Sequence, residues 1–308
     1  MEYAIMIEGQ NGLTWSRWQR IAKAVEDLGF AGLYRSDHYT NLNPPDKDSL
    51  ELWVSLTWLA SHTSRIEFGP LVSPMSFRDP TMTARMAVAV DDLSGGRLTL
   101  GMGAGWQERE HAHYGWDLLD VPGRLDRFEE ALEIVTHLLG DDQPVDYDGK
   151  YYRLEEAVLL PRPARAGGPP IAIGGNGTKR TLPLAARFAA EWNGVFLTAD
   201  RFAELNQLLD RYLIAVDRRP EDMRRSLMVG TVIGRYEDEL ARKLADERSW
   251  WHGREPEELR QHGVVVGIPE QYREQLAEYA RAGVQRIMLQ WLDLDDLEGL
   301  EALALELL

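Results

Sequence analysis

Short apolar runs alternate with amphipathic segments along the whole chain, and the alternation recurs eight times. The apolar runs have the length of buried strands and occupy 3–9, 31–36, 65–73, 97–103, 169–175, 192–198, 226–234 and 284–292. Helical spacing of apolar residues follows at 14–29, 50–63, 79–96, 124–140, 178–191, 200–217, 236–251, 268–283 and 295–308. The helices at 236–251 and 268–283 flank an insertion and both belong to the seventh unit. Near-continuous apolar strands that alternate with helices predict a parallel sheet covered on both faces.

Eight strand–helix units in 308 residues favour one architecture of the α/β class. A closed (β/α)8 TIM barrel fits this length better than an open doubly wound sheet. We expect a single domain over 1–308, because no linker, repeat or low-complexity tract divides the chain. Two insertions interrupt the pattern: 141–168, after the fourth helix, carries an Asp-Gly hairpin signal, and 250–263 lies near the seventh helix.

Charge and composition exclude several classes of function. A formal net charge of -16 argues against nucleic acid or an anionic membrane as partner. Without cysteine there is no disulfide, thiolate nucleophile or cysteine metal site. The His-Ala-His at 111–113 lies in a predicted loop without a third ligand, so no metal is expected. The N-terminus lacks a signal-peptide pattern, and we expect a cytoplasmic protein that acts on a small molecule.

The end of the second strand carries the first candidate for chemistry. Active sites of such barrels lie on the loops at the C-terminal ends of the strands. In "GLYRSDHYT", Asp37 and His38 stand at that end. Histidine is suited to proton transfer near neutral pH, and a carboxylate beside it could fix its tautomer, although adjacent side chains often point apart. Alternatively, Asp37 caps the loop and His38 packs beneath it; the rim position favours the functional interpretation.

Two glycine-rich strand ends are candidate ligand contacts. The fourth strand ends in Gly103, Ala104 and Gly105, followed by Trp106 as a candidate pocket residue. The absence of side chains there would let a ligand lie against the backbone. Alternatively, the glycines only allow the backbone to bend at a corner of the barrel. The fifth strand ends in Gly174, Gly175, Asn176 and Gly177, just before a helix. Free N–H groups at a helix N-terminus favour a phosphate, and an ordinary glycine-rich turn is the alternative.

Six segments together resemble a known family. They are "MIEGQNGLTW", "SDH", "GPLVSPMSFRDP", "LSGGRLTLGMGAGW", "PIAIGGNGTKRTLPLAARFAAEWNG" and "VVGIPEQ". In their order and spacing they resemble the luciferase-like monooxygenase superfamily, a TIM-barrel group that uses FMN or the deazaflavin coenzyme F-420. The resemblance covers nearly the whole chain. Its Ser-Asp-His ending of the second strand is similar to the F-420-dependent branch, whereas FMN-dependent members more often show a Glu-His-His type ending.

The resemblance implies roles for the candidate residues. His38 would lie near the deazaflavin ring and act as acid or base for the substrate, with Asp37 orienting it or the ring. A non-proline cis peptide, Leu71–Val72, would form a bulge behind the ring. The cofactor would pass along Gly103, Ala104 and Gly105, and its phosphate would bind at Gly174, Gly175, Asn176 and Gly177.

The implied activity is hydride transfer between F-420 and a small organic substrate. An FMN-dependent monooxygenase and a barrel that only binds a ligand are the alternatives. The related glucose-6-phosphate dehydrogenases carry a glutamate after the fourth strand, and the resemblance implies that Trp106 takes that position in this chain. We therefore expect an apolar or aromatic substrate in place of a sugar phosphate. The family also implies a homodimer, and a flavin or F-420 reductase as the source of reduced cofactor.

Overall fold

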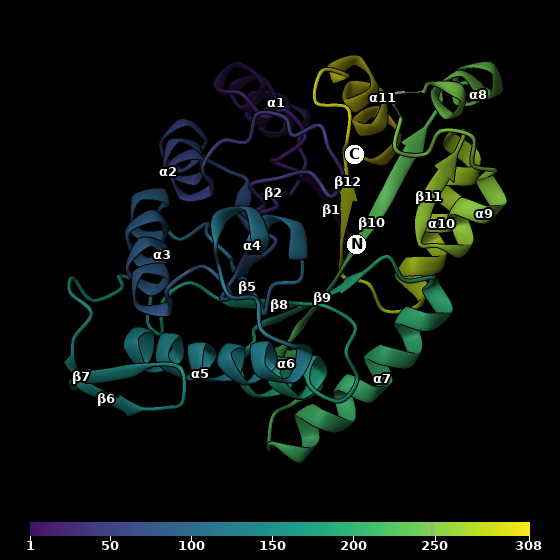
Figure 1. Ribbon diagram of the computed structural model, residues 1–308. Helices are drawn as coiled ribbons and strands as arrows, with labels where there is room; N and C mark the ends of the chain where they lie inside the picture. Colours follow the sequence, from purple (N-terminus) through teal and green to yellow (C-terminus); the bar gives the residue numbers. More distant parts are fainter. Residues whose placement is uncertain (248) are drawn as a thin grey trace.

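Parallel strands form a closed barrel in the computed structural model, which describes residues 1–247 and 249–308 (Figure 1). The barrel strands of the described part are β1 (Glu2–Ile7), β2 (Gly32–Arg35), β3 (Glu67–Pro70), β5 (Leu100–Gly103), β8 (Ile171–Gly174), β9 (Glu191–Val195), β10 (Arg224–Ile233) and β12 (Arg286–Gln290). Their order is β3-β2-β1-β12-β10-β9-β8-β5. The ring closes where Phe68 donates to the Arg97 carbonyl at 3.1 Å and accepts from Thr99 at 2.9 Å. The predicted TIM barrel is confirmed.

Helices surround this barrel on the outside (Figure 1). They are α1 (Trp15–Leu28), α2 (Leu52–His62), α3 (Pro80–Ser94), α5 (Val121–Gly140), α6 (Thr181–Phe188), α7 (Ala199–Ala215), α10 (Pro269–Arg281) and α11 (Leu297–Leu307). Local signals set their ends. At α3 the Asp79 carboxylate accepts from the first-turn N–H groups, Pro80 opens the helix, and Gly95 ends it at φ 71. In the described part of the chain, no helix is long and apolar enough to cross a bilayer.

Four elements differ from the sequence prediction. The helix expected at 236–251 ends earlier, as α8 (Glu237–Ala245), and Arg248 within that range lies outside the described residues. Segment 250–263 holds a short helix, α9 (Pro256–Gln261), which leads into an unpredicted strand, β11 (Val264–Gly267). This strand pairs in parallel with the C-terminal part of β10. A further helix, α4 (Glu108–Tyr114), occupies a segment that was expected to be a loop.

Smaller elements complete the chain. Within 141–168, β6 (Val145–Asp148) and β7 (Arg153–Ala157) pair as an antiparallel hairpin. A two-residue strand, β4 (Ser73–Pro74), pairs with β5, and a short 3-10 helix, η1 (Pro220–Asp222), precedes β10. Neither β4 nor η1 has a hydrophobic repeat of its own, so both are set by their neighbours.

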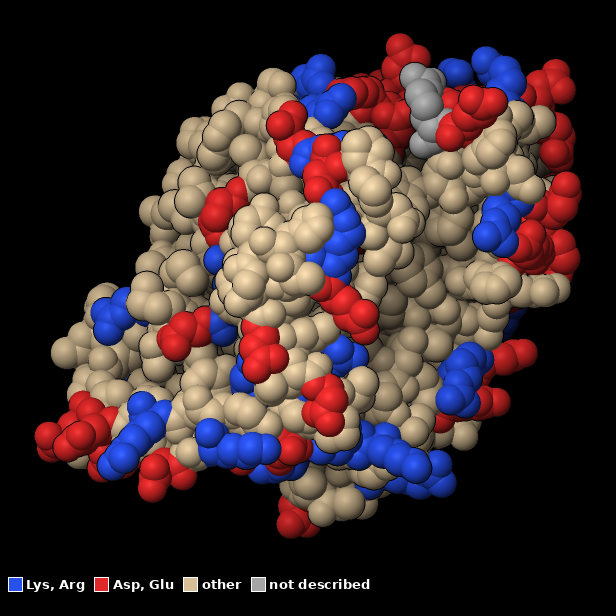
Figure 2. All heavy atoms as spheres, in the orientation of Figure 1, with Lys and Arg blue, Asp and Glu red and all other residues tan. Residues whose placement is uncertain are grey.

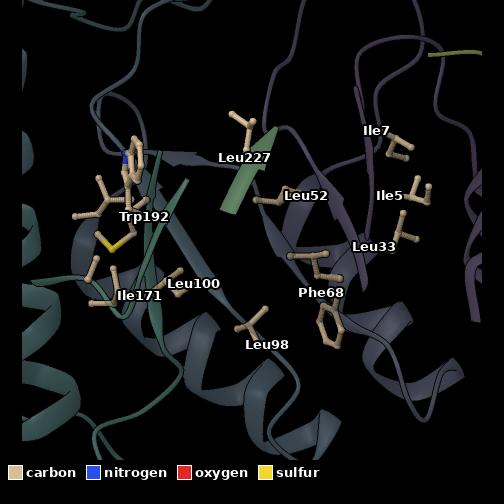
Figure 3. Close-up of a cluster of buried hydrophobic side chains, with 14 of the residues drawn as sticks. Ile5, Ile7, Leu33, Leu52, Phe68, Leu98, Leu100, Ile171, Trp192 and Leu227 are labelled. Carbon is tan, nitrogen blue, oxygen red and sulfur yellow. The ribbon is translucent and has the colours of Figure 1, made fainter. Parts of the chain in front are cut away.

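The two faces of each strand contribute to separate apolar clusters. Outward side chains pack between the barrel and the helices, as Ile5, Leu33 and Trp192 do in Figure 3. A second cluster takes the alternate residues of the same strands: Ala4, Met6, Tyr34, Leu71, Met228 and Met288. Because successive side chains of a strand point to opposite faces, this second cluster fills the barrel interior.

Below that cluster, the N-terminal end of the barrel holds buried charge. The Arg286 guanidinium is 1% exposed and binds the Glu2 carboxylate at 2.6 Å and the Glu67 carboxylate at 2.9 Å. Its Nη1 also donates to the Tyr34 hydroxyl at 2.6 Å. Glu191 is buried beside it at 4.0 Å, and burial raises the pKa of that carboxyl although Arg286 opposes the shift. Arg224 contacts Glu67 at 3.1 Å and Glu191 at 3.7 Å, so two arginines share the charge of these acids.

The close approach of β3 to β5 depends on Gly69. A Cβ at that position would lie 2.0 Å from the Thr99 carbonyl oxygen, which is backbone. We expect Gly69→Ala to lower the free energy of unfolding by about 1–3 kcal/mol, because the closing strands must separate. Gly140→Ala is the control, since a Cβ added there would meet nothing within 4 Å beyond its own helix backbone and its chain neighbours. Urea unfolding should show a lower midpoint for the first variant only; equal midpoints would contradict the closure contact.

Candidate active site

Polar contacts fix the loop that leaves β2. Arg35, the last residue of the strand, donates to the Ser55 hydroxyl and to the Leu50 carbonyl, each at 2.7 Å. The Ser36 hydroxyl accepts from the Gly9 N–H at 3.0 Å and donates to the Gln10 side chain at 2.8 Å. These bonds tie the exit of β2 to α2 on one side and to the β1–α1 loop on the other. These bonds therefore fix the position of the backbone at Asp37 and His38.

His38 is paired with Glu110, a residue of α4. The Nδ1 atom of His38 lies 3.0 Å from Glu110 Oε1, while the Tyr39 N–H donates to Oε2 at 3.1 Å. Glu110 is 1% exposed and His38 16%. Among the described residues, Nε2 of His38 has no hydrogen-bond partner. The carboxylate therefore orients the imidazole and leaves Nε2 for a ligand.

Glu110 also decides the charge of His38. Burial favours the neutral imidazole, but the hydrogen bond and the charge of Glu110 outweigh it, with smaller help from Glu8 and Asp37. The net effect raises the pKa of His38 above its usual value. The imidazole is thus more readily protonated near neutral pH than a free histidine, which suits a group that must donate a proton.

Trp106 shields the same histidine from one side. Its ring meets the His38 ring edge-to-face, with centroids 5.4 Å apart at 83°. The tryptophan is 54% exposed, so part of its ring is open to solvent. The role of Trp106 as a substrate-pocket residue stays a prediction.

Asp37 has partners other than His38. It is buried, and its two carboxylate oxygens take a paired contact from Arg78, at 2.9 Å from Nε and 2.7 Å from Nη2. Ser73 donates to the same carboxylate at 3.2 Å. The expectation that Asp37 orients His38 is therefore corrected, because the hydrogen-bonding acid is Glu110. Asp37 instead ties the end of β2 to the segment after β3.

The expected cis peptide is present at Leu71–Val72. The Val72 side chain fills the space left by two glycines on neighbouring strands. A Cβ would lie 2.5 Å from Val72 Cγ2 if added to Gly103, and 3.2 Å from Val72 Cγ1 if added to Gly174. The glycines at these strand ends therefore accommodate the valine bulge as well as any ligand above it. The predicted cofactor contacts of Leu71, Val72 and Gly103 stay predictions.

The segment Gly103–Gly105 packs closely on the chain after β4. Gly105 has φ 84, and a Cβ there would lie 2.1 Å from the Ser76 hydroxyl oxygen. That oxygen is buried and has no hydrogen-bond partner among the described residues. Ala104 is half-buried against the apolar core. An orphaned hydroxyl beside this strand end is a feature that a polar ligand group would satisfy.

Hydrogen bonds to the neighbouring strand fix the shape of the loop from Gly174 to Gly177. The Gly175 N–H donates to the Asn193 carbonyl at 2.9 Å. The Asn176 amide bonds the backbone of Val195 in both directions, at 2.8 Å and 3.0 Å, so this side chain is occupied. The N–H groups of Asn176 and Gly177 have no acceptor among the described residues. Both lie just before α6 and are exposed, as an anion site requires.

Glu110 is the main residue that sequence reasoning missed. The segment "QEREHAHYG" is predicted to be a loop. As a helix it places Gln107, Glu110 and Tyr114 at spacings of three and four, on one side. Gln107 and Glu110 are buried, and Gln107 accepts from the Thr40 hydroxyl at 2.7 Å. The helical spacing of Glu110 from Gln107 was the signal in the sequence that could have indicated a buried polar side of this helix.

Glu110→Gln should lower the pKa of His38, because the variant removes the carboxylate that raises it. In the wild type the folded-state pKa exceeds the unfolded value of about 6.5. This pairing therefore stabilises the fold fully below about pH 6.5 and is lost as the pH rises through the folded pKa. NMR titration of labelled histidine measures the shift. The exposed Glu108→Gln is the control, and an unchanged His38 pKa in Glu110→Gln would refute the pairing.

Comparison with known families identifies the chain. The model of the luciferase-like monooxygenase family matches residues 1–286. That match spans far more than half of the chain, so the protein belongs to the luciferase-like monooxygenase family.

The curated relatives include a protein named as a monooxygenase and two named as a reductase or an oxidoreductase. A 4-hydroxyprotoasukamycin monooxygenase of Streptomyces nodosus subsp. asukaensis is 31% identical over 183 residues, 58% of this chain and 47% of the relative. A 5,10-methylenetetrahydromethanopterin reductase of Archaeoglobus fulgidus is 34% identical over 178 residues, with coverage of 58% and 47%. A putative coenzyme F-420-dependent oxidoreductase of Mycobacterium tuberculosis is 28% identical over 201 residues, with coverage of 62% and 54%. The chain spans about half the length of these relatives.

Solved structures share the fold at low identity. An F-420-dependent secondary alcohol dehydrogenase has a TM-score of 0.80 at 17% identity, with coverage of 94% of this chain and 92% of that one. The F-420-dependent tetrahydromethanopterin reductase of Methanopyrus kandleri scores 0.82 at 19%, with 99% and 97%. An FMN-bound Baeyer–Villiger monooxygenase of Pseudomonas putida scores 0.76 at 17%, with 99% and 97%. The proteins whose folds resemble this chain thus include both F-420-dependent and FMN-containing ones.

Proposed function

We propose that the protein is an F-420-dependent oxidoreductase acting on a small organic carbonyl or alcohol. The observation that carries the proposal is the His38–Glu110 pair at the barrel mouth, 3.0 Å apart and buried, with Nε2 unpartnered among the described residues. An oriented, readily protonated imidazole is what a carbonyl reduction needs beside a hydride donor. Relatives named as F-420-dependent, among them the Mycobacterium tuberculosis protein, support the choice of cofactor.

The residues present fit such a coenzyme. The loop before α6 offers the backbone N–H groups of Asn176 and Gly177 to a phosphate. At the neighbouring strand end, the orphaned Ser76 hydroxyl lies beside Gly105. When bound, the deazaflavin would supply hydride transfer, which the side chains of this protein cannot supply themselves.

The chain's own residues would handle the proton and the position of the substrate. His38 would exchange a proton with the substrate oxygen through Nε2, since Nδ1 is committed to Glu110. Glu110 would hold the ring and stabilise its protonated form. Trp106, edge-on to the imidazole, would keep water from that side.

Cofactor binding tests the proposal. We expect F-420 to bind at least tenfold more tightly than FMN in equilibrium titrations of the purified protein. Lys179 is exposed beside the glycine loop, so Lys179→Glu should weaken F-420 binding about tenfold, because like charge repels the phosphate. Arg153→Glu, on the exposed β7, is the charge-matched control and should leave binding unchanged.

An FMN-dependent monooxygenase is the second candidate. The Streptomyces nodosus relative is named as a monooxygenase, and the Pseudomonas putida structure holds FMN in the same fold. Tight FMN binding with no F-420 binding in the same titration would replace our proposal with this one.

A further inference from the structure

The side chain of Glu8, the residue that follows β1, is directed into the mouth of the barrel. Ala4 and Met6 of β1 belong to the apolar cluster that fills the barrel interior. Because strand side chains alternate between the two faces, Glu8 points the same way as Met6. Met6 pairs in register with Gln290, which lies two residues after Met288 of the same cluster. Glu8 and Gln290 therefore form a polar layer above the apolar cluster, at the end where active sites of such barrels lie.

Two amide side chains hold this carboxylate. Nε2 of Gln290 donates to Oε1 of Glu8 at 2.7 Å, and Nε2 of Gln10 donates to Oε2 at 2.9 Å. Gln10 is held in turn, because its side-chain oxygen accepts from the Ser36 hydroxyl at 2.8 Å. Both glutamines are buried, whereas Glu8 is partly exposed. A carboxylate offers about four acceptor sites, so the two amides leave room for a further donor.

The charge of Glu8 is stabilised by neutral groups in place of a bound cation. Within the described part of the chain, Glu8 forms no ion pair. Burial lowers the pKa of Arg35 to about 10, and among the acids that oppose this shift Glu8 acts less strongly than Asp37 and Glu51. A hydroxyl on a ligand would add a charge-assisted hydrogen bond to Glu8, which is stronger than a hydrogen bond between neutral groups.

His38 lies close enough to Glu8 for the two groups to meet one small ligand. β1 and β2 are neighbours, with Ile7 opposite Arg35, so Glu8 and His38 both follow adjoining strand ends. Burial opposes the charge of His38, but the hydrogen bond to Glu110 and the charges of Glu110 and Glu8 together raise its pKa. Glu8 can only accept a hydrogen bond, whereas Nε2 of the protonated imidazole can donate one.

The spacing of the two groups and their surroundings indicate the kind of substrate. Neighbouring strands lie about 4.8 Å apart, so a carbonyl oxygen and a hydroxyl on adjacent carbons can reach both groups. On the face that carries α4, Figure 2 shows a hollow lined mostly by uncharged atoms. A small uncharged molecule with one hydrogen-bond donor suits this side of the barrel.

We propose that Glu8 is a substrate-binding residue that accepts a hydrogen bond from a hydroxyl on the carbon next to the reacting carbon. The substrates would be α-hydroxy ketones, or the corresponding vicinal diols in the reverse direction. This inference rests on the proposed function at His38. In the reduction, the carbonyl carbon gains a hydride from reduced F-420 and its oxygen gains a proton from His38. The C=O π bond breaks, the coenzyme is oxidised by two electrons, and the neighbouring hydroxyl is unchanged.

Ligand binding followed at the His38 imidazole tests the inference without turnover. The probes are α-hydroxyacetophenone, acetophenone and α-methoxyacetophenone, titrated with and without F-420 and followed by NMR of labelled histidine. We expect the hydroxy ketone to bind about tenfold more tightly than acetophenone, as a hydrogen bond to a charged acceptor provides. The methyl ether has no donor and should show no such preference. Glu8→Met removes both acceptor oxygens and should abolish the preference, and Glu8→Gln should reduce it.

Glu155→Gln is the matched control, because Glu155 is an exposed acid on β7 and should keep the full preference. In the wild type, equal affinity for the hydroxy ketone and acetophenone, or no binding of the hydroxy ketone, would overturn the inference. An equal loss of preference in Glu155→Gln would also overturn it. Weaker F-420 binding by Glu8→Gln with an intact ketone preference would assign Glu8 to the coenzyme and contradict the proposed role.

The same titrations separate this inference from the proposed function. A hydroxy-ketone preference in a protein that binds no F-420 would support the role of Glu8 while refuting the proposed function. F-420 binding with equal affinity for the three probes would do the reverse.

Discussion

His38→Ala should lower turnover with F-420 by about 10²- to 10⁴-fold, the range that a positioned acid or base contributes. The F-420 dissociation constant should change less than about threefold, because the glycine loop before α6 is untouched. The reason is the geometry of Nε2, which is unpartnered among the described residues while Nδ1 is held by Glu110. Steady-state rates on a reducible ketone, combined with cofactor titration, separate the two effects.

The control for this variant is another histidine. His62 lies on the exposed face of α2 and stacks on Trp58 with centroids 4.1 Å apart. His62→Ala should leave turnover within about twofold of the wild type, as expected for an exposed residue away from the barrel mouth. If His38→Ala retained wild-type turnover on an accepted substrate, the assigned proton exchange would be wrong.

Arg286→Met should lower the free energy of unfolding by about 3–5 kcal/mol, the usual effect of leaving buried charges unpaired. The variant removes the ion pairs to Glu2 and Glu67, and it leaves the buried Glu191 with the partly exposed Arg224, at 3.7 Å, as its cation. The loss should shrink as the pH falls. Burial already raises the pKa of Glu191, so its carboxyl becomes neutral first, and a neutral group needs no counter-charge. Denaturant unfolding at two pH values measures both effects.

Arg20→Met is the control for the arginine variant. Arg20 binds Asp295 at 2.8 Å, but both side chains are about half exposed, so the loss should stay below about 1 kcal/mol. Adding Glu191→Gln to Arg286→Met should restore part of the stability, because it removes a buried acid that has lost one of its two cations. Equal losses in the two arginine variants would show that the barrel interior does not depend on the buried cation.

Most of the fold could be predicted because barrel strands carry their own signal. Runs such as 226–234 and 284–292 are apolar on both faces, and eight of them in order favour closure. Two elements lacked that signal. The strand at 264–267 is only four residues long and follows an insertion. The helix at 108–114 is mostly polar, because one side of it faces a polar site in place of an apolar core.

Single residues of the candidate site could be predicted from their place in the sequence, but the contacts between distant residues could not. His38 could be found from its place at a strand end. Its partner Glu110 is separated from it by 72 residues, and no local pattern joins them. The pairing of Asp37 with Arg78 is likewise a contact between different strand ends, 41 residues apart. Adjacency in sequence suggested the wrong acid, because neighbouring side chains of an extended segment point to opposite sides.

The most direct test of the central claim follows the hydride itself. The protein is supplied with reduced F-420 carrying deuterium at C5, together with an accepted aromatic ketone and oxygen. Mass spectrometry of the product should show an alcohol with one deuterium on the former carbonyl carbon. An ester or hydroxylated product that contains an oxygen atom from molecular oxygen, with no deuterium on carbon, would contradict the claim.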